Sequence, residues 1–178
     1  MGYLKKYRVN FRELDLGHHR FSFEIDDRFF SWFEKSEIQQ GSLTAAVELI
    51  KEERLTTLHV KLLGEVSVRC DRCLDYFMHP VEFTGTLYVK PEEDEWEEKG
   101  KEEVILVSPD QSEVDLAQYF YESIHLSLPL KRVHPDDENG NSTCDQDMLK
   151  LLEAHQREEQ NETDPRWDKL KNLFVKRN

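Results

Sequence analysis

Apolar and polar residues alternate over much of residues 43–90, and a period of two is typical of half-buried β-strands. The longest alternating run extends from Thr57 to Cys70. Its apolar positions share one face: Leu58, Val60, Leu62, Val66, Val68 and Cys70. Gly64 interrupts the run and predicts a bend or a bulge. Residues 43–49 and 81–89 alternate in the same way, so we expect three neighbouring strands.

Two shorter segments extend this predicted sheet. The apolar run VILVS at residues 104–108 predicts a fourth strand, and RFSFEI at residues 20–25 predicts a further strand at one edge. Strands that follow one another through short connections and bury one face usually form an antiparallel meander. We therefore expect an antiparallel β meander.

The helical patterns come later in the chain. Residues 112–128 predict a helix that is capped by Ser112 and Asp115 and ends before Pro129. We expect its apolar stripe to cover the sheet. Two more helices are predicted, one from Thr143 as N-cap to His155 and one from Asp164 as N-cap to the C-terminus. The predicted fold class is α+β, an antiparallel meander covered by a helix and followed by a helical tail.

We expect one domain overall with three parts. Residues 1–40 form an N-terminal segment that packs on the sheet, residues 41–130 form the sheet and its covering helix, and residues 131–178 form a loop with metal ligands and the C-terminal helices. The acidic stretch at residues 91–103 reads as a solvated connection.

Charge and hydropathy narrow the function classes. The 37 acidic residues outnumber the 24 basic ones and give a net charge of −13, which opposes nonspecific binding to nucleic acid. No apolar run reaches the ~20 residues of a membrane span, and the N-terminus lacks the apolar centre of a signal peptide. We expect a cytoplasmic protein, and the three cysteines argue against a disulfide framework.

The motif RCDRCLDYF at residues 69–77 places two cysteines in C-x-x-C spacing. A thiol oxidoreductase needs its first cysteine at a helix N-terminus, whereas Cys70 ends a predicted strand. A zinc site needs two more ligands, which Cys144 and His134 can supply, with His79 as the competing histidine. The third possibility is a buried or semi-exposed pair of reduced thiols. The residues alone do not decide among these three interpretations.

Sequence motifs of known catalytic sites are missing. The chain has no glycine-rich phosphate loop, no G-x-S-x-G and no H-E-x-x-H. We therefore expect a protein that is not an enzyme. The rival hypotheses are a thiol redox protein that uses Cys70 and Cys73, and a generic interaction module stabilised by zinc.

The order of these segments resembles the YceD-like family, the large ribosomal RNA subunit accumulation proteins. The resemblance covers roughly residues 40–175 and is most specific in CDRCL and DPRWDKLKNL. The family motif falls on these residues: Cys70, Arg72, Cys73, Leu74, Leu128, Pro129, His134, Cys144, Pro165, Trp167 and Leu170. Many members have a second C-x-x-C, where this sequence keeps His134 and Cys144.

The resemblance implies a non-enzymatic factor in ribosome biogenesis that supports accumulation of large-subunit ribosomal RNA. It strengthens the prediction of a zinc ion held by Cys70, Cys73, His134 and Cys144. The expected partner is a ribosomal protein, an assembly factor or a large-subunit rRNA precursor, with no membrane and no small-molecule substrate. Because of the acidic surface, a basic protein is the favoured partner. The predicted partner-binding residues are Arg72, Lys131, Arg132, Arg166, Trp167, Lys169, Leu170 and Phe174.

Overall fold

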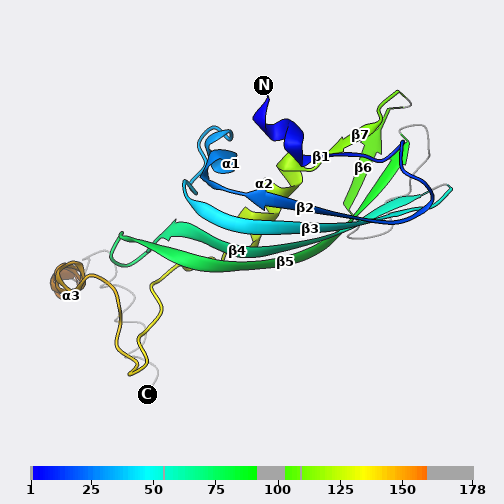
Figure 1. The fold of residues 1–178 in the computed structure, drawn as a ribbon. Helices are drawn as coiled ribbons and strands as arrows, with labels where there is room; N and C mark the ends of the chain where they lie inside the picture. The colour runs from blue at the N-terminus through cyan, green and yellow to red at the C-terminus, as the bar shows by residue number, and fades with distance from the viewer. Residues whose placement is uncertain (1, 54, 92–102, 109, 160–178) are drawn as a thin grey trace, which may run out of the picture. The chain divides into compact units, whose positions relative to one another are not determined.

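The main element of the fold is a five-stranded sheet with the order β2-β3-β4-β5-β6 (Figure 1). The computed structural model describes residues 2–53, 55–91, 103–108 and 110–159. The sheet is built from these strands: β2 (Gly17–Ile25), β3 (Gly41–Lys51), β4 (Thr56–Arg69), β5 (Tyr76–Pro91) and β6 (Glu103–Val107). The remaining elements are a 3-10 helix η1 (Tyr3–Tyr7), β1 (Arg8–Asn10), α1 (Asp27–Ser31), β7 (Glu113–Asp115), α2 (Ala117–Ser127) and α3 (Gln146–Glu159). The predicted α+β class is confirmed.

Pairing in the sheet differs from the prediction at one edge. β2, β3 and β4 are antiparallel neighbours, as expected. β6 instead pairs parallel to β5, with Leu87 opposite Glu103. The expectation of an all-antiparallel meander is wrong here, because parallel pairing requires the chain to cross over between the two strands.

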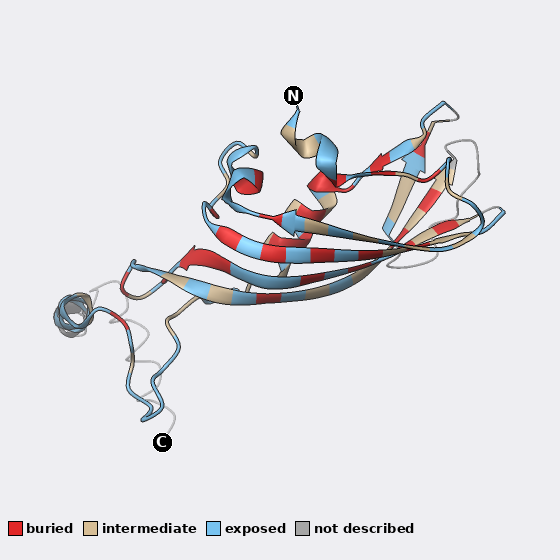
Figure 2. Cartoon of the chain, in the orientation of Figure 1, coloured by how far each residue is buried: buried red, intermediate tan, exposed pale blue. Residues whose placement is uncertain are grey.

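The apolar positions that alternate in the sequence are buried in the sheet, and the polar positions between them are more exposed (Figure 2). Along β3, positions 41, 43, 45, 47 and 49 are buried, and Ser42, Thr44 and Ala46 are exposed. Gly64 lies opposite Leu43, and the pairing of β4 with β3 runs through it residue for residue, so the predicted bulge is absent. Its irregularity is the positive φ of +154°. The buried side chains of β3 and β4 form one face of the core.

Helix α2 covers that face. Phe120 packs against Phe23 of β2 with ring centroids 5.7 Å apart, and Tyr119 contacts Phe83 of β5 at 6.1 Å. Tyr7 is fully buried against Phe29, and its hydroxyl donates to the backbone oxygen of Glu24. The predicted covering helix is therefore confirmed.

Helix α2 begins later than predicted. Residues 113–115 form β7, which pairs antiparallel with β1. The helix starts at Ala117, whose N–H donates to the Asp115 carboxylate. Ser112 does not cap it, because its backbone oxygen accepts from Phe11 and continues the β1–β7 ladder.

The described chain divides into two compact units. The first comprises residues up to Val68 and Tyr76–Arg132, and the second comprises Arg69–Asp75 with the residues from Val133 onwards. The second unit contains α3 and all three cysteines. Among the described residues, no helix is long and apolar enough to cross a membrane.

Candidate metal centre

The first part of the site is a tight turn between β4 and β5. Asp71–Cys73 form the turn, and the N–H of Leu74 donates to the oxygen of Cys70 at 3.0 Å. The N–H of Cys70 donates to the oxygen of Asp75 at 2.8 Å, which closes the loop. We call residues 70–75 the knuckle. It holds the Sγ atom of Cys70 3.4 Å from the backbone N–H of Arg72.

Leu74 adopts a left-handed conformation, with φ of +66°. This conformation is costly for any residue with a Cβ atom, at about 1–2 kcal/mol. The Leu74 side chain is 47% exposed, so burial does not compensate for that cost. Strain of this kind persists where the surrounding structure fixes the backbone, as the two knuckle hydrogen bonds do.

The second part of the site is a small hairpin from His134 to Cys144. Asp136 and Ser142 form an antiparallel bridge, and the tip turns at Gly140 with φ of +80°. His134 and Cys144 each lie two residues beyond that bridge. Because side chains alternate along extended chains, a pair two residues from a bridge lies on the same face of the hairpin. The hairpin therefore presents these two side chains together.

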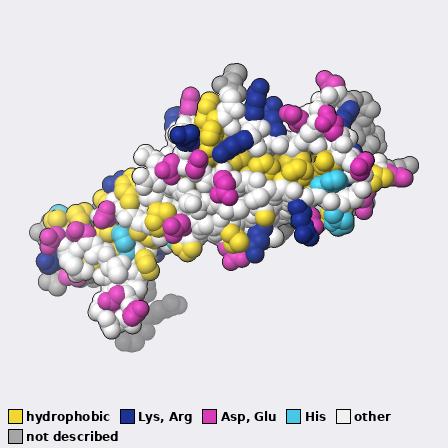
Figure 3. Space-filling model, viewed as in Figure 1, with side chains coloured by type: hydrophobic (Ala, Val, Ile, Leu, Met, Phe, Trp, Pro, Cys, Tyr) yellow, Lys and Arg dark blue, Asp and Glu magenta, His cyan; other side chains and the backbone are white. Residues whose placement is uncertain are grey.

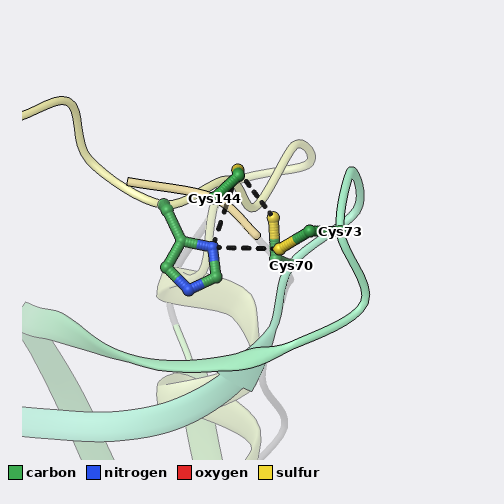
Figure 4. Close-up of side chains that lie close together, drawn as sticks. Cys70, Cys73 and Cys144 are labelled. Atoms are coloured by element: carbon green, nitrogen blue, oxygen red, sulfur yellow. Dashed lines mark hydrogen bonds between the residues drawn. The ribbon is translucent and has the colours of Figure 1, made fainter. Parts of the chain in front are cut away.

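The knuckle and the hairpin bring four donor atoms into one cluster (Figure 4). The Sγ atoms of Cys70 and Cys144 are 3.8 Å apart, and Nδ1 of His134 lies 3.4 Å from Cys73 Sγ and 3.7 Å from Cys144 Sγ. All four atoms lie within 4.8 Å of one another. The three cysteines are free thiols and at most 3% exposed.

These separations fit the edges of a tetrahedron around a zinc ion. Zinc binds sulfur at about 2.3 Å and imidazole nitrogen at about 2.0–2.1 Å, so tetrahedral geometry requires S···S of about 3.8 Å and S···N of about 3.6 Å. The three edges given above agree with those values to within about 0.2 Å. The donor set of three thiolates and one imidazole is also a common structural zinc set. The residues can therefore hold a metal ion.

The backbone favours a thiolate at Cys70. Burial opposes ionisation, but backbone N–H groups of Cys73, Arg72 and His134 outweigh it and lower the pKa of Cys70 to about 6. Burial raises the pKa of Cys73, against N–H donors at Asp75 and Asp145. A metal ligand must be deprotonated, so the knuckle prepares Cys70 for binding.

The structure brings together the four residues that the sequence predicts as metal ligands, and His79 does not belong to the cluster. Among the predicted partner-binding residues, Arg132 forms an ion pair with Glu37 at 3.1 Å, and Lys131 is exposed. Within the described part of the chain, the buried Nε of Arg72 has no hydrogen-bond partner. The others, Arg166, Trp167, Lys169, Leu170 and Phe174, lie outside the described residues.

Sequence reasoning missed the residues that shape the hairpin. The Asp137 carboxylate accepts from the backbone N–H groups of Asn139 and Asn141, and these bonds lower its pKa. The turn-forming string DENGN was the available signal.

The prediction of Thr143 as the N-cap of α3 is wrong, because its hydroxyl donates to the oxygen of Pro135. Asp145 caps α3 instead, accepting from the N–H of Met148 at 2.7 Å.

Residues 58–174 match the family described as large ribosomal RNA subunit accumulation protein YceD. The chain belongs to the YceD family. Neither the curated proteins nor the solved structures contain a significant match to the chain. The YceD match includes the knuckle, α2 and the hairpin, while α1 and β3 precede it.

Proposed function

We propose that this protein is a non-catalytic factor that supports accumulation of large-subunit ribosomal RNA by binding a ribosomal partner. Membership of the YceD family carries the proposal, because the family description names that role. The closed cluster of four protein donors supports a structural role for the metal, since catalytic zinc sites keep a position open for water or substrate.

We propose zinc as the metal in that cluster. When bound, zinc supplies a tetrahedral cross-link and no reaction chemistry. The chain's own residues do the rest: the knuckle orients Cys70 and Cys73, and the hairpin orients His134 and Cys144. The ion thereby joins two segments that are about 60 residues apart in the sequence.

Metal analysis of protein purified without chelator tests the zinc proposal. We expect one equivalent of zinc, lost in Cys73→Ser and retained in the control His79→Gln, which changes a histidine outside the cluster. Metal-free protein with a reversible Cys70–Cys73 disulfide would support the redox alternative instead. The position of Cys70 before a turn, not at a helix N-terminus, favours zinc.

The partner contact is proposed from charge. The net charge of −13 suits a basic ribosomal protein or assembly factor, which would contact the acidic surface. Where the partner is rRNA, Arg72, Lys131 and Arg132 are the cationic contacts that we propose among the described residues. The predicted contacts of the C-terminal segment, from Arg166 to Phe174, belong to the same proposal.

The ribosomal role is tested by deleting the gene and measuring large-subunit rRNA and its precursors. We expect less mature large-subunit rRNA, with normal levels restored by the wild-type gene and by His79→Gln but not by Cys73→Ser. A ribosome profile that does not change on deletion would contradict the proposal. Affinity capture with mass spectrometry then identifies the ribosomal partner.

A further inference from the structure

A cationic and aromatic surface surrounds α1 in the first unit. Trp32, the residue that ends α1, is 45% exposed, and its ring stacks on Tyr3 with planes 3° apart and centroids at 6.3 Å. The Lys6 ammonium lies 4.2 Å from the centre of the Tyr3 ring. We call Tyr3, Trp32, Arg28 and Lys35 the α1 platform. Figure 3 shows Lys and Arg side chains gathered beside hydrophobic ones in this part of the molecule.

A cavity of about 650 Å³ adjoins the platform. It lies between α1 and the loop that follows, and its lining combines buried Phe30 and Ile38 with exposed Arg28 and Lys35. A volume of this size is within the range of small-molecule and nucleotide pockets. The cavity therefore offers an apolar floor beside two cations and one carboxylate, that of Asp27.

The carboxylates of Asp26 and Asp27 lie beside these cations in the sequence but are hydrogen-bonded to other groups. Asp26 accepts from the hydroxyl of Tyr3 and the N–H of Phe29, and Asp27 accepts from the N–H of Gly41 at 2.8 Å. Among the described residues, neither the Arg28 nor the Lys35 side chain is in an ion pair or hydrogen bond. Both charges are thus available to an anionic ligand.

Charge is also distributed favourably for such a ligand. Residues 1–40 contain seven basic and seven acidic residues, so the whole excess of negative charge lies in the rest of the chain. Repulsion of a phosphate polymer is therefore weaker around this segment than the net charge of the whole chain suggests. The platform also lies outside residues 58–174, so its features are independent of the family match.

We propose that the α1 platform binds a short stretch of single-stranded RNA. Flat exposed aromatic rings stack on unpaired bases, and neighbouring cations contact the phosphates, a combination that recurs in single-strand binding proteins. An acidic protein segment would satisfy Arg28 and Lys35 but would make no use of the stacked Tyr3 and Trp32 rings. The proposal rests on the proposed ribosomal role for its choice of RNA.

Direct binding of labelled oligouridine and oligoadenosine to the full-length protein tests this proposal. We expect Trp32→Ala to weaken binding about tenfold, as loss of one stacked base does. The double variant Arg28→Ala/Lys35→Ala should reduce the slope of log affinity against log salt by about 1.4, at about 0.7 per lost phosphate contact. A duplex RNA of equal length should bind more weakly than either single strand.

Matched controls separate this site from general surface effects. Tyr76→Ala removes another exposed aromatic ring, and Arg20→Ala removes an exposed cation of the sheet, so both variants should bind like the wild type. A variant in which Trp32 is the only tryptophan gives a second measurement, with fluorescence quenched as RNA is added. Thermal melting confirms that each variant is folded.

No RNA binding by the wild type at low salt, or equal affinity for wild type and Trp32→Ala, would overturn the proposal. Trp32 fluorescence that is not quenched at saturating RNA would overturn it as well. That result would favour a protein ligand for the Tyr3 and Trp32 rings. The gene-deletion experiment is independent of these measurements. The failure of this site can therefore be distinguished from the failure of the ribosomal role.

Discussion

Gly64 occupies a position in β4 that only glycine fits. Its φ is +154°, and a Cβ atom there would lie 2.2 Å from the backbone oxygen of Ser42 and 2.5 Å from Cα of Leu43. Both neighbours are backbone atoms of β3, so neither can move without breaking the ladder. The close approach of the two strands therefore depends on the missing side chain.

We expect Gly64→Ala to lower the free energy of unfolding by about 3 kcal/mol, from the clash and the backbone conformation together. Gly17→Ala is the matched control, because Gly17 also has a positive φ but has open space around its Cβ position. It should cost only about 1 kcal/mol. Urea unfolding measures both values, and equal losses would show that the contact with β3 contributes nothing.

Leu74 is the opposite case, a residue with a side chain where glycine would be less strained. Its φ of +66° costs about 1–2 kcal/mol, whereas glycine loses about 0.5–1 kcal/mol in entropy on folding. We expect Leu74→Gly to stabilise metal-loaded protein by up to about 1 kcal/mol, measured by thermal melting. A destabilised variant would show that the exposed leucine makes a contact that matters more than its backbone strain.

At the scale of elements, α3 depends on its first residues. Asp145 accepts from the N–H of Met148, and the backbone of Asp145 also accepts from Leu149. We expect Asp145→Ala to destabilise α3 by about 1 kcal/mol and to reduce the helical circular dichroism signal. Asp147→Ala is the control, because Asp147 pairs with Lys150 on the helix surface and should cost about 0.3–0.5 kcal/mol.

Zinc content should stay at one equivalent in both variants, since Asp145 contributes its backbone N–H and not its side chain to the sulfur of Cys73. Loss of the metal in Asp145→Ala would show that the Asp145 side chain supports the metal cluster as well as capping α3.

The strands with regular alternation were predictable from the sequence, whereas short and nonlocal elements were not. β3 and β4 alternate over enough residues for periodicity to identify them. β1 and β7 have three residues each, too few for a pattern, so residues 113–115 were read as the start of a helix. The parallel pairing of β6 depends on the path of the chain between strands, which no local pattern encodes.

The cluster of candidate ligands was predictable from side-chain chemistry, because only three cysteines were available and C-x-x-C has few physical uses. The sequence left His134 and His79 as competing fourth ligands. The structure decides between them, since Nδ1 of His134 lies 3.7 Å from Sγ of Cys144, in the hairpin that the Asp136–Ser142 bridge closes. Such a pairing arises from hairpin geometry and is not visible in residue spacing.

At the scale of the whole molecule, all four donors belong to the second compact unit. We expect chelation to affect this unit and to leave the five-stranded sheet intact. In amide hydrogen exchange, the N–H groups of Cys70, Leu74 and Asn141 should lose protection by about a hundredfold, because structural zinc supplies much of the folding energy of small metal units.

The N–H groups within β3 should keep their protection under the same conditions, because β2 and β4 flank this strand on both sides. Loss of protection that is uniform across β3 and the knuckle would mean that the two units unfold as one. The same measurement on Cys73→Ser should reproduce the effect of the chelator.

The pairing of β1 with β7 joins Arg8 to Asp115 and buries Tyr7 against Phe120. During synthesis the first strand therefore has no partner until more than 100 further residues have been made. At about 5–20 residues per second, this delay is about 5–20 s. β1 is thus among the last strands to reach its native pairing, although Tyr7 just before it contacts Phe29, which is made soon after it. Rapid early folding is favoured instead in the β3–β4 hairpin, whose strands are adjacent in sequence.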